Sequence, residues 1–379
     1  MGNNDARVWA NGCFDVFHFG HANFLRQAKV MGSYLIAGVH GDSDIARNKA
    51  SPVMGERERA KIISAVKWVD EVRTGVPYGD VLKTLDENAC QFCVHGDDIA
   101  QDANGRDIYA ECKEKGRFCE CKRTEGISTT LIIDRILLAD AGGHKELTHW
   151  PHVGGPLSQI SKEIENEPED AQKKNEESEI LKENDSNGFV QRRLEMPVEY
   201  YREKVDEFSS KSRTPERNMK VIYAQGVFDL FHSGHVDFLE KCKASVEDGF
   251  LVVGVLTDEE ISRVYGGYPV TNTYERVLAL LSCKFVDQVE IGVPYEITSQ
   301  FLEDMKIEYV FHGMLWELPS DPYKAVRDKN IFYQVDSGND LTTSAIIERI
   351  INSREMYRER NSKKSESQFS RVRLQGNKP

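Results

Sequence analysis

Short apolar runs alternate with stretches of helical periodicity over the first 141 residues of the chain. The predicted strands cover residues 7–12, 33–40, 69–72, 91–95 and 118–121, and the predicted helices cover residues 18–30, 56–66, 78–87, 107–115 and 128–139. Strands that alternate with helices in this way are typical of βαβ units. We therefore predict an α/β fold in which a parallel, doubly wound sheet carries helices on both faces.

The alternation stops after residue 141 and starts again at residue 218. Between Lys162 and Asp185 there are ten acidic and four basic residues, a composition that cannot bury a core and predicts disorder at about 155–195. Residues 197–208 are more apolar, and we expect them to pack as a helix on the second half. The chain therefore divides into a first domain, a linker, a second domain and a polar tail, at residues 1–141, 142–217, 218–352 and 353–379.

The second half repeats the sequence of the first. Residues 222–235 match residues 8–21 at an offset of 214, and residues 286–295 match residues 69–78 at an offset of 217. Nearly constant offsets over most of a domain indicate a duplicated fold. The repeat is far longer than a solenoid period, so we predict a tandem of two whole domains.

Composition narrows the class of protein. The 379 residues are 40% hydrophobic and 29% charged, with a formal net charge of −13. An acidic chain argues against a general nucleic-acid binder, which needs a basic face. No apolar run approaches the ~20 residues that span a bilayer. Eight cysteines without a secretory signal indicate reduced thiols and a cytoplasmic location. Cys90 and Cys93 have a spacing seen in zinc sites, but strand alternation places them on opposite faces, so no metal site is expected.

Two histidines follow the first predicted strand, where a helix begins. His18 and His21 are three residues apart and share one face of that helix. The first turn of the helix offers N–H groups and the positive end of the dipole, and Gly20 leaves room between the rings. This arrangement suits a polyphosphate anion, and on its own it is also compatible with capping or packing.

Further cations and hydroxyls follow the later strands. Lys49, in a polar loop, can place an ammonium against phosphate, and Arg123 offers a bidentate donor. Gly126 allows a close approach before a helix that Ser128 and Thr129 can cap. Each feature alone fits a solvated side chain or a cap. Together they are expected to converge at the carboxyl edge of the sheet, which indicates catalysis by positioning and charge neutralisation.

The pair of motifs at residues 18–21 and 123–130 resembles the cytidylyltransferase family. That family has a Rossmann-like fold and joins CTP to a phosphorylated alcohol with release of pyrophosphate. The tandem form is similar to the members that use phosphoethanolamine in the CDP-ethanolamine route to phosphatidylethanolamine, in the cytoplasm and peripheral to the endoplasmic reticulum. The resemblance implies two Rossmann-like nucleotidyltransferase domains joined by a disordered acidic linker. It leaves open a homodimer or an intramolecular pseudo-dimer of the two domains.

The resemblance also implies roles for the candidate residues. His18 and His21 would bind the triphosphate, Lys49 would bridge the two reacting phosphates, and Arg123 would hold the substrate phosphate. Mg²⁺ is expected with CTP, without a cage of protein ligands. Asp97 or Asp98 could meet the ethanolamine ammonium or a cytosine edge. The nucleotide- and substrate-binding candidates are Gly12, Cys13, Phe14, His95, Gly96, Asp97, Asp98, Thr124, Gly126, Ser128 and Thr129.

The second half departs from this pattern. His232 and His235 remain, but Tyr265 stands at the position of Lys49 and Ser337 at that of Arg123. We therefore predict that the second half is catalytically weak or inactive. It is either a purely structural domain or a second nucleotide site, whose candidate residues are Val227, Phe228, His232, His235, His312, Gly313, Thr342, Thr343 and Ser344.

Three other classes of protein share parts of this pattern. An enzyme that uses phosphocholine is the nearest, but that group usually continues into a long amphipathic membrane helix, whereas the tail beyond Asn352 is short and polar. A non-catalytic, CTP-binding regulatory protein would have no need of both Lys49 and Arg123. A class I aminoacyl-tRNA synthetase would add a lysine-rich motif and a basic face for tRNA.

Overall fold

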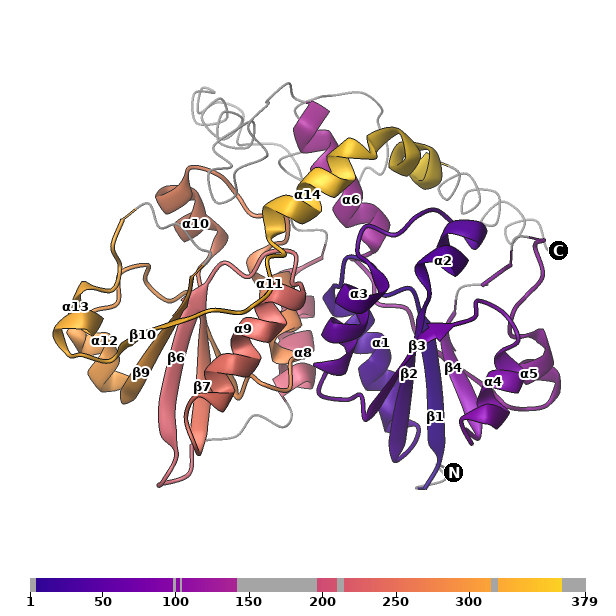
Figure 1. The fold of residues 1–379 in the computed structure, drawn as a ribbon, viewed down its shortest axis with the longest axis horizontal. Coiled ribbons are helices and arrows are strands. Elements are labelled where there is room, and N and C mark those ends of the chain that lie inside the picture. The colour runs from indigo at the N-terminus through magenta and orange to yellow at the C-terminus, as the bar shows by residue number, and fades with distance from the viewer. Residues whose placement is uncertain are drawn as a thin grey trace.

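The computed structural model describes residues 5–97, 100–102, 104–141, 196–209, 215–314 and 320–362. Two α/β domains lie side by side in it (Figure 1). The predicted disorder at 155–195 and the candidate Asp98 lie outside the described residues. None of the described helices combines the length and the apolar character that a membrane crossing needs.

The first domain is built on five parallel strands in the order β3-β2-β1-β4-β5. The chain runs outward from β1 through β2 to β3 and then crosses to β4 and β5, so the direction reverses between β1 and β4. Ligands of open α/β sheets bind at this point, beyond the carboxyl ends of the strands. The strands are β1 Arg7–Gly12, β2 Tyr34–His40, β3 Glu71–Val76, β4 Phe92–Gly96 and β5 Phe118–Cys121.

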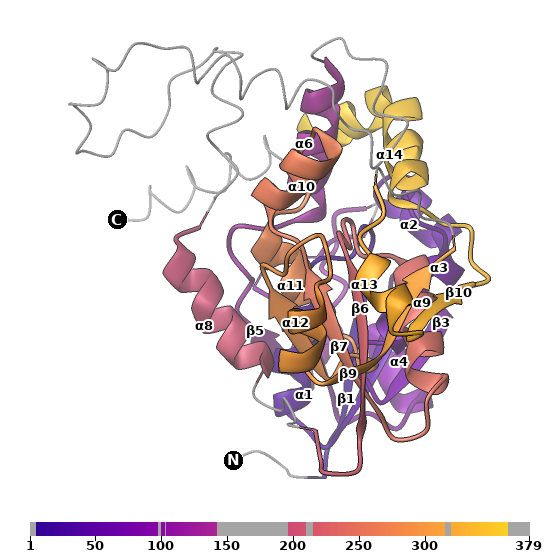
Figure 2. The same ribbon diagram turned by 90° about the vertical axis from the view of Figure 1, so that its left-hand side faces the viewer.

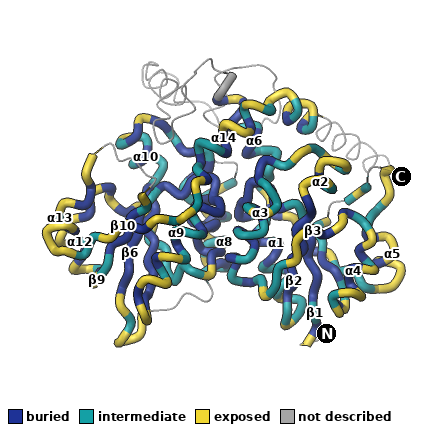
Figure 3. Tube along the Cα trace, viewed as in Figure 1, coloured by how far each residue is buried: buried dark blue, intermediate teal, exposed yellow. Residues whose placement is uncertain are grey.

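Helices cover both faces of this sheet, as predicted. Val8 and Ala10 belong to a core cluster with residues of α1, α3 and α6, whereas Trp9 belongs to a cluster with residues of α4 and α5. This is the alternation that a doubly wound sheet requires, and Figure 3 shows both sheets buried. The helices are α1 Phe19–Val30, α2 Asp42–Asn48, α3 Glu56–Ser64, α4 Val81–Glu87, α5 Ala110–Glu114 and α6 Thr129–Ala141.

The interpretation of the segment around Lys49 as a polar loop was wrong, because α2 lies there. The helix has only seven residues and buries only Ile45, so it has little apolar periodicity to detect. Its charges favour a helix, with Asp42 and Asp44 in the first turn and Arg47 in the last.

The second domain has the same topology. Its strand order, β10-β9-β6-β7-β8, is that of the first sheet read from the other edge. This confirms the predicted duplication of a doubly wound fold. The elements are β6 Lys220–Gly226, α9 Ser233–Ala244, β7 Gly249–Val255, α10 Asp258–Tyr265, α11 Thr273–Leu281, β8 Gln288–Ile291, α12 Ser299–Asp304, β9 Ile307–Gly313, α13 Lys324–Asp328, β10 Phe332–Val335 and α14 Thr343–Asn352.

The predicted helix at 197–208 is present as α8 (Val198–Ser209), and it contacts both domains. Tyr201 stacks on Tyr274 of the second domain, with ring centroids 5.3 Å apart, and meets Phe19 of the first at 6.2 Å. Figure 2 shows α8 running along one side of the molecule, beside α1 and α11. The helix therefore holds the two domains together, whereas the sequence predicted a contact with the second domain only.

The two domains pack around a pseudo-twofold axis. An antiparallel bridge joins Val66 to Cys283, two positions that are equivalent at the offset of 217. On either side of it, Lys67 N–H donates to the Ser282 carbonyl and Lys284 N–H to the Ala65 carbonyl, both at 2.8 Å. Each bond is the counterpart of the other in the repeat, so the interface has the geometry of a homodimer within one chain.

Two ion pairs across this interface are also counterparts. Arg135 on α6 binds both carboxylate oxygens of Glu275 on α11, at 2.7 and 2.9 Å. Arg349 on α14 binds both oxygens of Glu58 on α3 at the same two distances. The two pairs differ in burial. The side chains of Arg135 and Glu275 are 11% and 2% exposed, whereas those of Arg349 and Glu58 are 42% and 24% exposed.

The predicted polar tail begins with a helix. Residues 354–362 are helical and lie over the first domain, beyond α14 in Figure 1. Tyr357 is buried there and donates its hydroxyl to the Ser51 carbonyl at 3.4 Å. One buried aromatic residue in a charged segment was too weak a pattern to predict this helix.

The counterpart ion pairs give a prediction about stability. We expect Arg135→Gln to lower the free energy of unfolding by about 3 kcal/mol or more, because it leaves the buried Glu275 carboxylate without its cation. We expect Arg349→Gln to lower it by about 1 kcal/mol at most, because that pair is solvated. Urea unfolding of both variants measures the difference, and equal shifts would contradict it.

Candidate functional site

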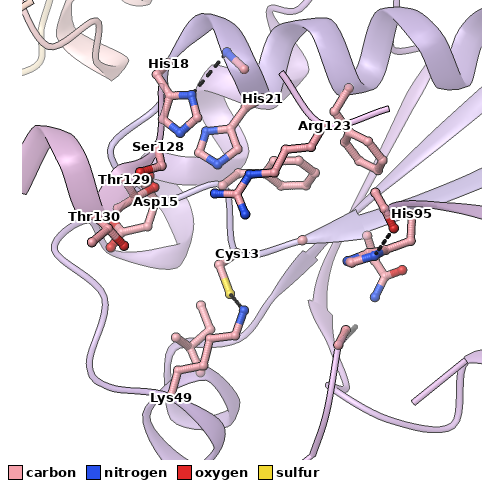
Figure 4. Close-up of a pocket in the computed structure, with 18 of the residues that line it drawn as sticks. Cys13, Asp15, His18, His21, Lys49, His95, Arg123, Ser128, Thr129 and Thr130 are labelled. Carbon is pink, nitrogen blue, oxygen red and sulfur yellow. Dashed lines mark hydrogen bonds between the residues drawn. The ribbon is translucent and has the colours of Figure 1, made fainter. Parts of the chain in front are cut away.

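A cavity of about 830 Å³ lies beyond the carboxyl ends of β1 and β4 in the first domain. Its size is that of a site for a nucleotide and a small second substrate. The predicted residues Asp97 and Gly126 are not in its lining. The predicted residues that do line it are Gly12, Cys13, Phe14, His18, His21, Lys49, His95, Gly96, Arg123, Thr124, Ser128 and Thr129 (Figure 4).

A strained turn after β1 forms the floor of the cavity. Phe14 and Val16 have positive φ angles, 53° and 45°, which L-residues rarely adopt. The carboxylate of Asp15 compensates, because it accepts the backbone N–H groups of Val16 at 3.1 Å and of Val53 and Met54 at 2.9 Å. This buried carboxylate therefore fixes the turn to the segment before α3.

The two histidines point into the cavity from the first turn of α1 (Figure 4). His18 is the N-cap, and its Nδ1 accepts the Gly20 N–H at 3.1 Å, which assigns its proton to Nε2. The His18 and His21 rings stack with centroids 3.8 Å apart. A Cβ on Gly20 would lie 2.9 Å from the His18 ring, so only glycine permits this rotamer. His18 is consequently a hydrogen-bond donor through Nε2.

Lys49 faces the histidines from the opposite wall (Figure 4). It is the C-cap of α2, and its Nζ lies 3.9 Å from Cys13 Sγ and 5.4 Å from the ring centre of Tyr78. The aromatic ring and the thiol thus contact the ammonium at the wall of the cavity.

The segment that leads into α6 supplies the third wall. Ser128 Oγ accepts the Leu131 N–H at 3.1 Å and can still donate its own hydrogen. The Thr129 hydroxyl donates to the Asp15 carbonyl at 2.9 Å, so it ties α6 to the strained turn. Gly126 has a φ of 73° and packs against Met196, so it serves the turn rather than the cavity. Figure 4 shows Arg123 extending beside His21.

Sequence reasoning missed a buried polar group below the cavity. The Tyr109 hydroxyl donates to Asn11 Oδ1 at 3.1 Å, and the Asn11 amide lies 3.2 Å from His40 Nε2. His40 Nδ1 lies 3.1 Å from the Val76 carbonyl. Burial lowers the pKa of His40 to about 4, which keeps the ring neutral.

Arg59 is a second residue that the motifs did not indicate. It is fully buried and donates to the carbonyls of Cys13 at 2.6 Å and His40 at 2.7 Å. The sequence did carry a signal, because Arg276 occupies the counterpart position at the offset of 217. In the structure Arg276 pairs with Asp258, as Arg59 pairs with Asp42. An arginine repeated in both halves indicates a structural role.

In the second domain, aromatic side chains pack on one another at the counterpart positions. Tyr265 packs on Tyr295 with ring centroids 6.0 Å apart, where the first domain has Lys49 over Tyr78. Tyr265 therefore contacts the counterpart of Tyr78, at the end of the helix that corresponds to α2. The His312 ring lies 3.2 Å from the Tyr323 hydroxyl.

In the second domain His232 is buried and His235 is partly buried, and both rings are uncharged. His232 caps α9 as His18 caps α1, and His235 Nδ1 accepts the His232 N–H at 3.3 Å. Burial lowers the pKa of both rings, that of His235 to about 3. The two histidines thus serve as the cap of α9. Near this cap, the Asn339 amide donates to the Asp237 carboxylate on α9 at 2.7 Å.

All eight cysteines are free. Burial raises the pKa of the Cys90 thiol to about 11, and it raises that of Cys93. Over the described part of the chain, no group of three histidine, cysteine or acidic side chains could hold a metal ion.

Comparison with known proteins adds four findings. A family model described as cytidylyltransferase-like matches twice, at residues 9–135 and 223–349. The chain is 40% identical to the ethanolamine-phosphate cytidylyltransferase of Mus musculus, over 96% of this chain and 90% of that protein. It is 39% identical to that of Dictyostelium discoideum, over 96% of each. A probable choline-phosphate cytidylyltransferase of Schizosaccharomyces pombe is 43% identical, over 35% of this chain and 37% of its own length.

The neutral His40 ring makes stability depend on pH. Its pKa is about 4 in the folded chain and ~6.5 when unfolded, so below pH 6.5 the unfolded state binds protons that the folded state does not. This contribution to stability is complete above pH 6.5 and is lost as pH falls towards 4. At pH 5.5 the loss is about 1.4 kcal/mol.

We expect His40→Gln to remove this part of the pH dependence, since glutamine can keep both hydrogen bonds without titrating. Urea unfolding at pH 7.5 and 5.5 measures it as the difference between the variant and the parent chain. A variant with an unchanged pH dependence would contradict the assignment.

Proposed function

Because this chain belongs to the cytidylyltransferase-like family, and within it to the ethanolamine-phosphate cytidylyltransferases, we infer that it transfers CMP from CTP to phosphoethanolamine. CDP-ethanolamine and pyrophosphate are the products, and the reaction is a step of phosphatidylethanolamine synthesis. The observation that carries the assignment to the first domain is the single cavity that joins His18, His21, Lys49 and Arg123.

The reaction needs no covalent enzyme intermediate. A phosphate oxygen of phosphoethanolamine attacks the α-phosphorus of CTP, and the bond from that phosphorus to the bridging oxygen of the β-phosphate breaks as pyrophosphate leaves. The problem for the protein is negative charge, since two anions must meet while a third departs. Positioning and electrostatic stabilisation account for most catalysis of this kind.

We assign the roles from the walls of the cavity. His18 and His21 donate to the triphosphate at the first turn of α1, where the helix dipole adds to their effect. Lys49, across from them, bridges the attacking phosphate and the α-phosphate. Arg123 holds the phosphate of phosphoethanolamine, and the Ser128 hydroxyl donates to the triphosphate.

The rest of the lining receives the nucleotide. Gly12, Cys13 and Phe14 lie along one side of the cavity, and His95 with Gly96 lies at the far side. The role of Asp97 towards the ethanolamine ammonium or a cytosine edge stays a prediction, and its side chain is exposed.

Magnesium is proposed to arrive with CTP rather than to reside in the protein. Mg²⁺ prefers carboxylate, phosphate and water oxygens. The described lining contains two carboxylates, those of Asp15 and Glu359, and Asp15 is committed to three backbone N–H groups. These residues do not fit a magnesium cage, so no step is assigned to a protein-bound metal.

The second domain is proposed to be inactive. Tyr265 brings an aromatic ring where the reaction needs an ammonium, and Ser337 replaces the arginine. The packing of that region favours a structural domain over a second nucleotide site. The pair of domains then acts as an intramolecular pseudo-dimer, and the free thiols support the proposed cytoplasmic location.

Substitution of Lys49 tests the site. We expect Lys49→Met to lower kcat/KM for CDP-ethanolamine formation by about 100-fold or more, because the transition state loses a cation. Arg47→Met is the matched control, since Arg47 lies on the same helix with a 72% exposed side chain. We expect that control within about twofold of the parent chain.

The same assay, run with labelled CTP and either phosphoethanolamine or phosphocholine, tests the substrate. Preference for phosphocholine would overturn the substrate assignment. Product from neither alcohol would favour a non-catalytic CTP-binding protein.

The two histidine motifs give a second comparison. We expect His18→Ala to lower kcat by about 100-fold or more and His232→Ala to change it by less than about fivefold. Melting midpoints report the loss of the buried cap at His232 separately. Equal losses of activity at equal stability would refute the inactivity of the second domain.

A further inference from the structure

The helix at residues 354–362 reaches from the second domain to the cavity of the first. Asn361 donates to the Asp134 carboxylate on α6 at 2.7 Å, and Tyr357 reaches the Ser51 carbonyl beyond α2. The helix is thereby attached to two opposite walls of the cavity. Three of its residues, Met356, Glu359 and Arg360, line the cavity.

Arg360 has unused hydrogen-bonding capacity. Its Nη2 is buried and has no partner among the described residues, whereas its Nε donates to Asn361 Oδ1 at 3.2 Å. The guanidinium carbon lies 4.9 Å from the ring centre of Tyr357, which fixes its plane. An arginine cannot shed its proton, and a buried donor without an acceptor is rare in a native structure.

Two carboxylates whose charges act on Arg360, those of Asp15 and Asp134, are already engaged. Asp15 accepts three backbone N–H groups, and Asp134 accepts the Asn361 amide. Burial lowers the pKa of the Arg360 guanidinium despite these two charges, so the protein alone compensates the cation incompletely. An anion in the cavity would supply the missing acceptor.

We propose that Arg360 binds the pyrophosphate portion of CTP, so that the helix at residues 354–362, which follows the second domain, completes the first domain's active site. Asn361 fixes the helix to α6, and α6 carries the Ser128 cap that faces the triphosphate. A guanidinium there stabilises the β- and γ-phosphates as the bond to the α-phosphorus breaks. The inference rests on the proposed function, since it takes CTP as the occupant of the cavity.

The test measures two ligands on the full chain by calorimetry. Inorganic pyrophosphate reports the β- and γ-phosphate subsite, and CMP reports the rest of the nucleotide site. We expect Arg360→Gln to weaken binding of pyrophosphate by about tenfold or more and to leave binding of CMP within about twofold. Arg360→Lys keeps the charge without the planar fork, and we expect an intermediate loss.

Arg358→Gln is the matched control. It removes the same charge from the same helix at an exposed position, and we expect it to change neither affinity. Equal weakening of both ligands by Arg360→Gln would assign the residue to packing alone, and unchanged binding of pyrophosphate would also overturn the proposal. Should Arg360→Gln fail to fold, Arg360→Lys supplies the same comparison.

Turnover separates this inference from the proposed function. If the parent chain makes no CDP-ethanolamine, the proposed function fails. If the parent chain is active and Arg360→Gln retains its affinity for pyrophosphate, only the role of Arg360 fails.

Discussion

The structure of the site depends on one buried carboxylate. Asp15 holds three backbone N–H groups, and its own carbonyl accepts the Thr129 hydroxyl, so it links β1, the entry to α3 and the entry to α6. The positive φ angles of Phe14 and Val16 persist only because these bonds over-determine the turn. Without that turn, neither the nucleotide floor nor the cap of α1 would be in place.

The second domain separates what the fold needs from what the chemistry needs. Asp229 binds the Val270 and Thr271 N–H groups as Asp15 binds their counterparts, and Phe228 and Leu230 have the same positive φ angles. Strain at this turn therefore belongs to the fold and is no sign of catalysis. The chemistry that we propose depends on the side chains that differ, above all the Lys49 ammonium, whose place is taken by the Tyr265 ring.

The sequence predicted the strands, the doubly wound topology and most of the cavity, because these depend on local periodicity and on motifs at strand ends. It could not predict features that arise from contacts between distant residues. The short helix before Lys49 buries too little to leave a pattern, and Arg360 is 230 positions (360 − 130) beyond Thr130, the last residue of the first domain that lines the cavity. Asp15 was overlooked for a similar reason, since an acidic residue in a turn is ordinarily solvated and only its partners show otherwise.

The pseudo-twofold interface has a consequence for assembly. In a homodimer the encounter of two domains is bimolecular, and the complex dissociates on dilution. Here the equivalent surfaces, with Val66 and Cys283 at their centre, belong to one polypeptide, so the tether replaces protein concentration with a fixed effective concentration. Each side of the interface is also encoded separately, which allows Arg135 and Arg349 to occupy equivalent positions with different burial. The second domain, which is proposed to be inactive, can therefore be retained as a permanently bound partner.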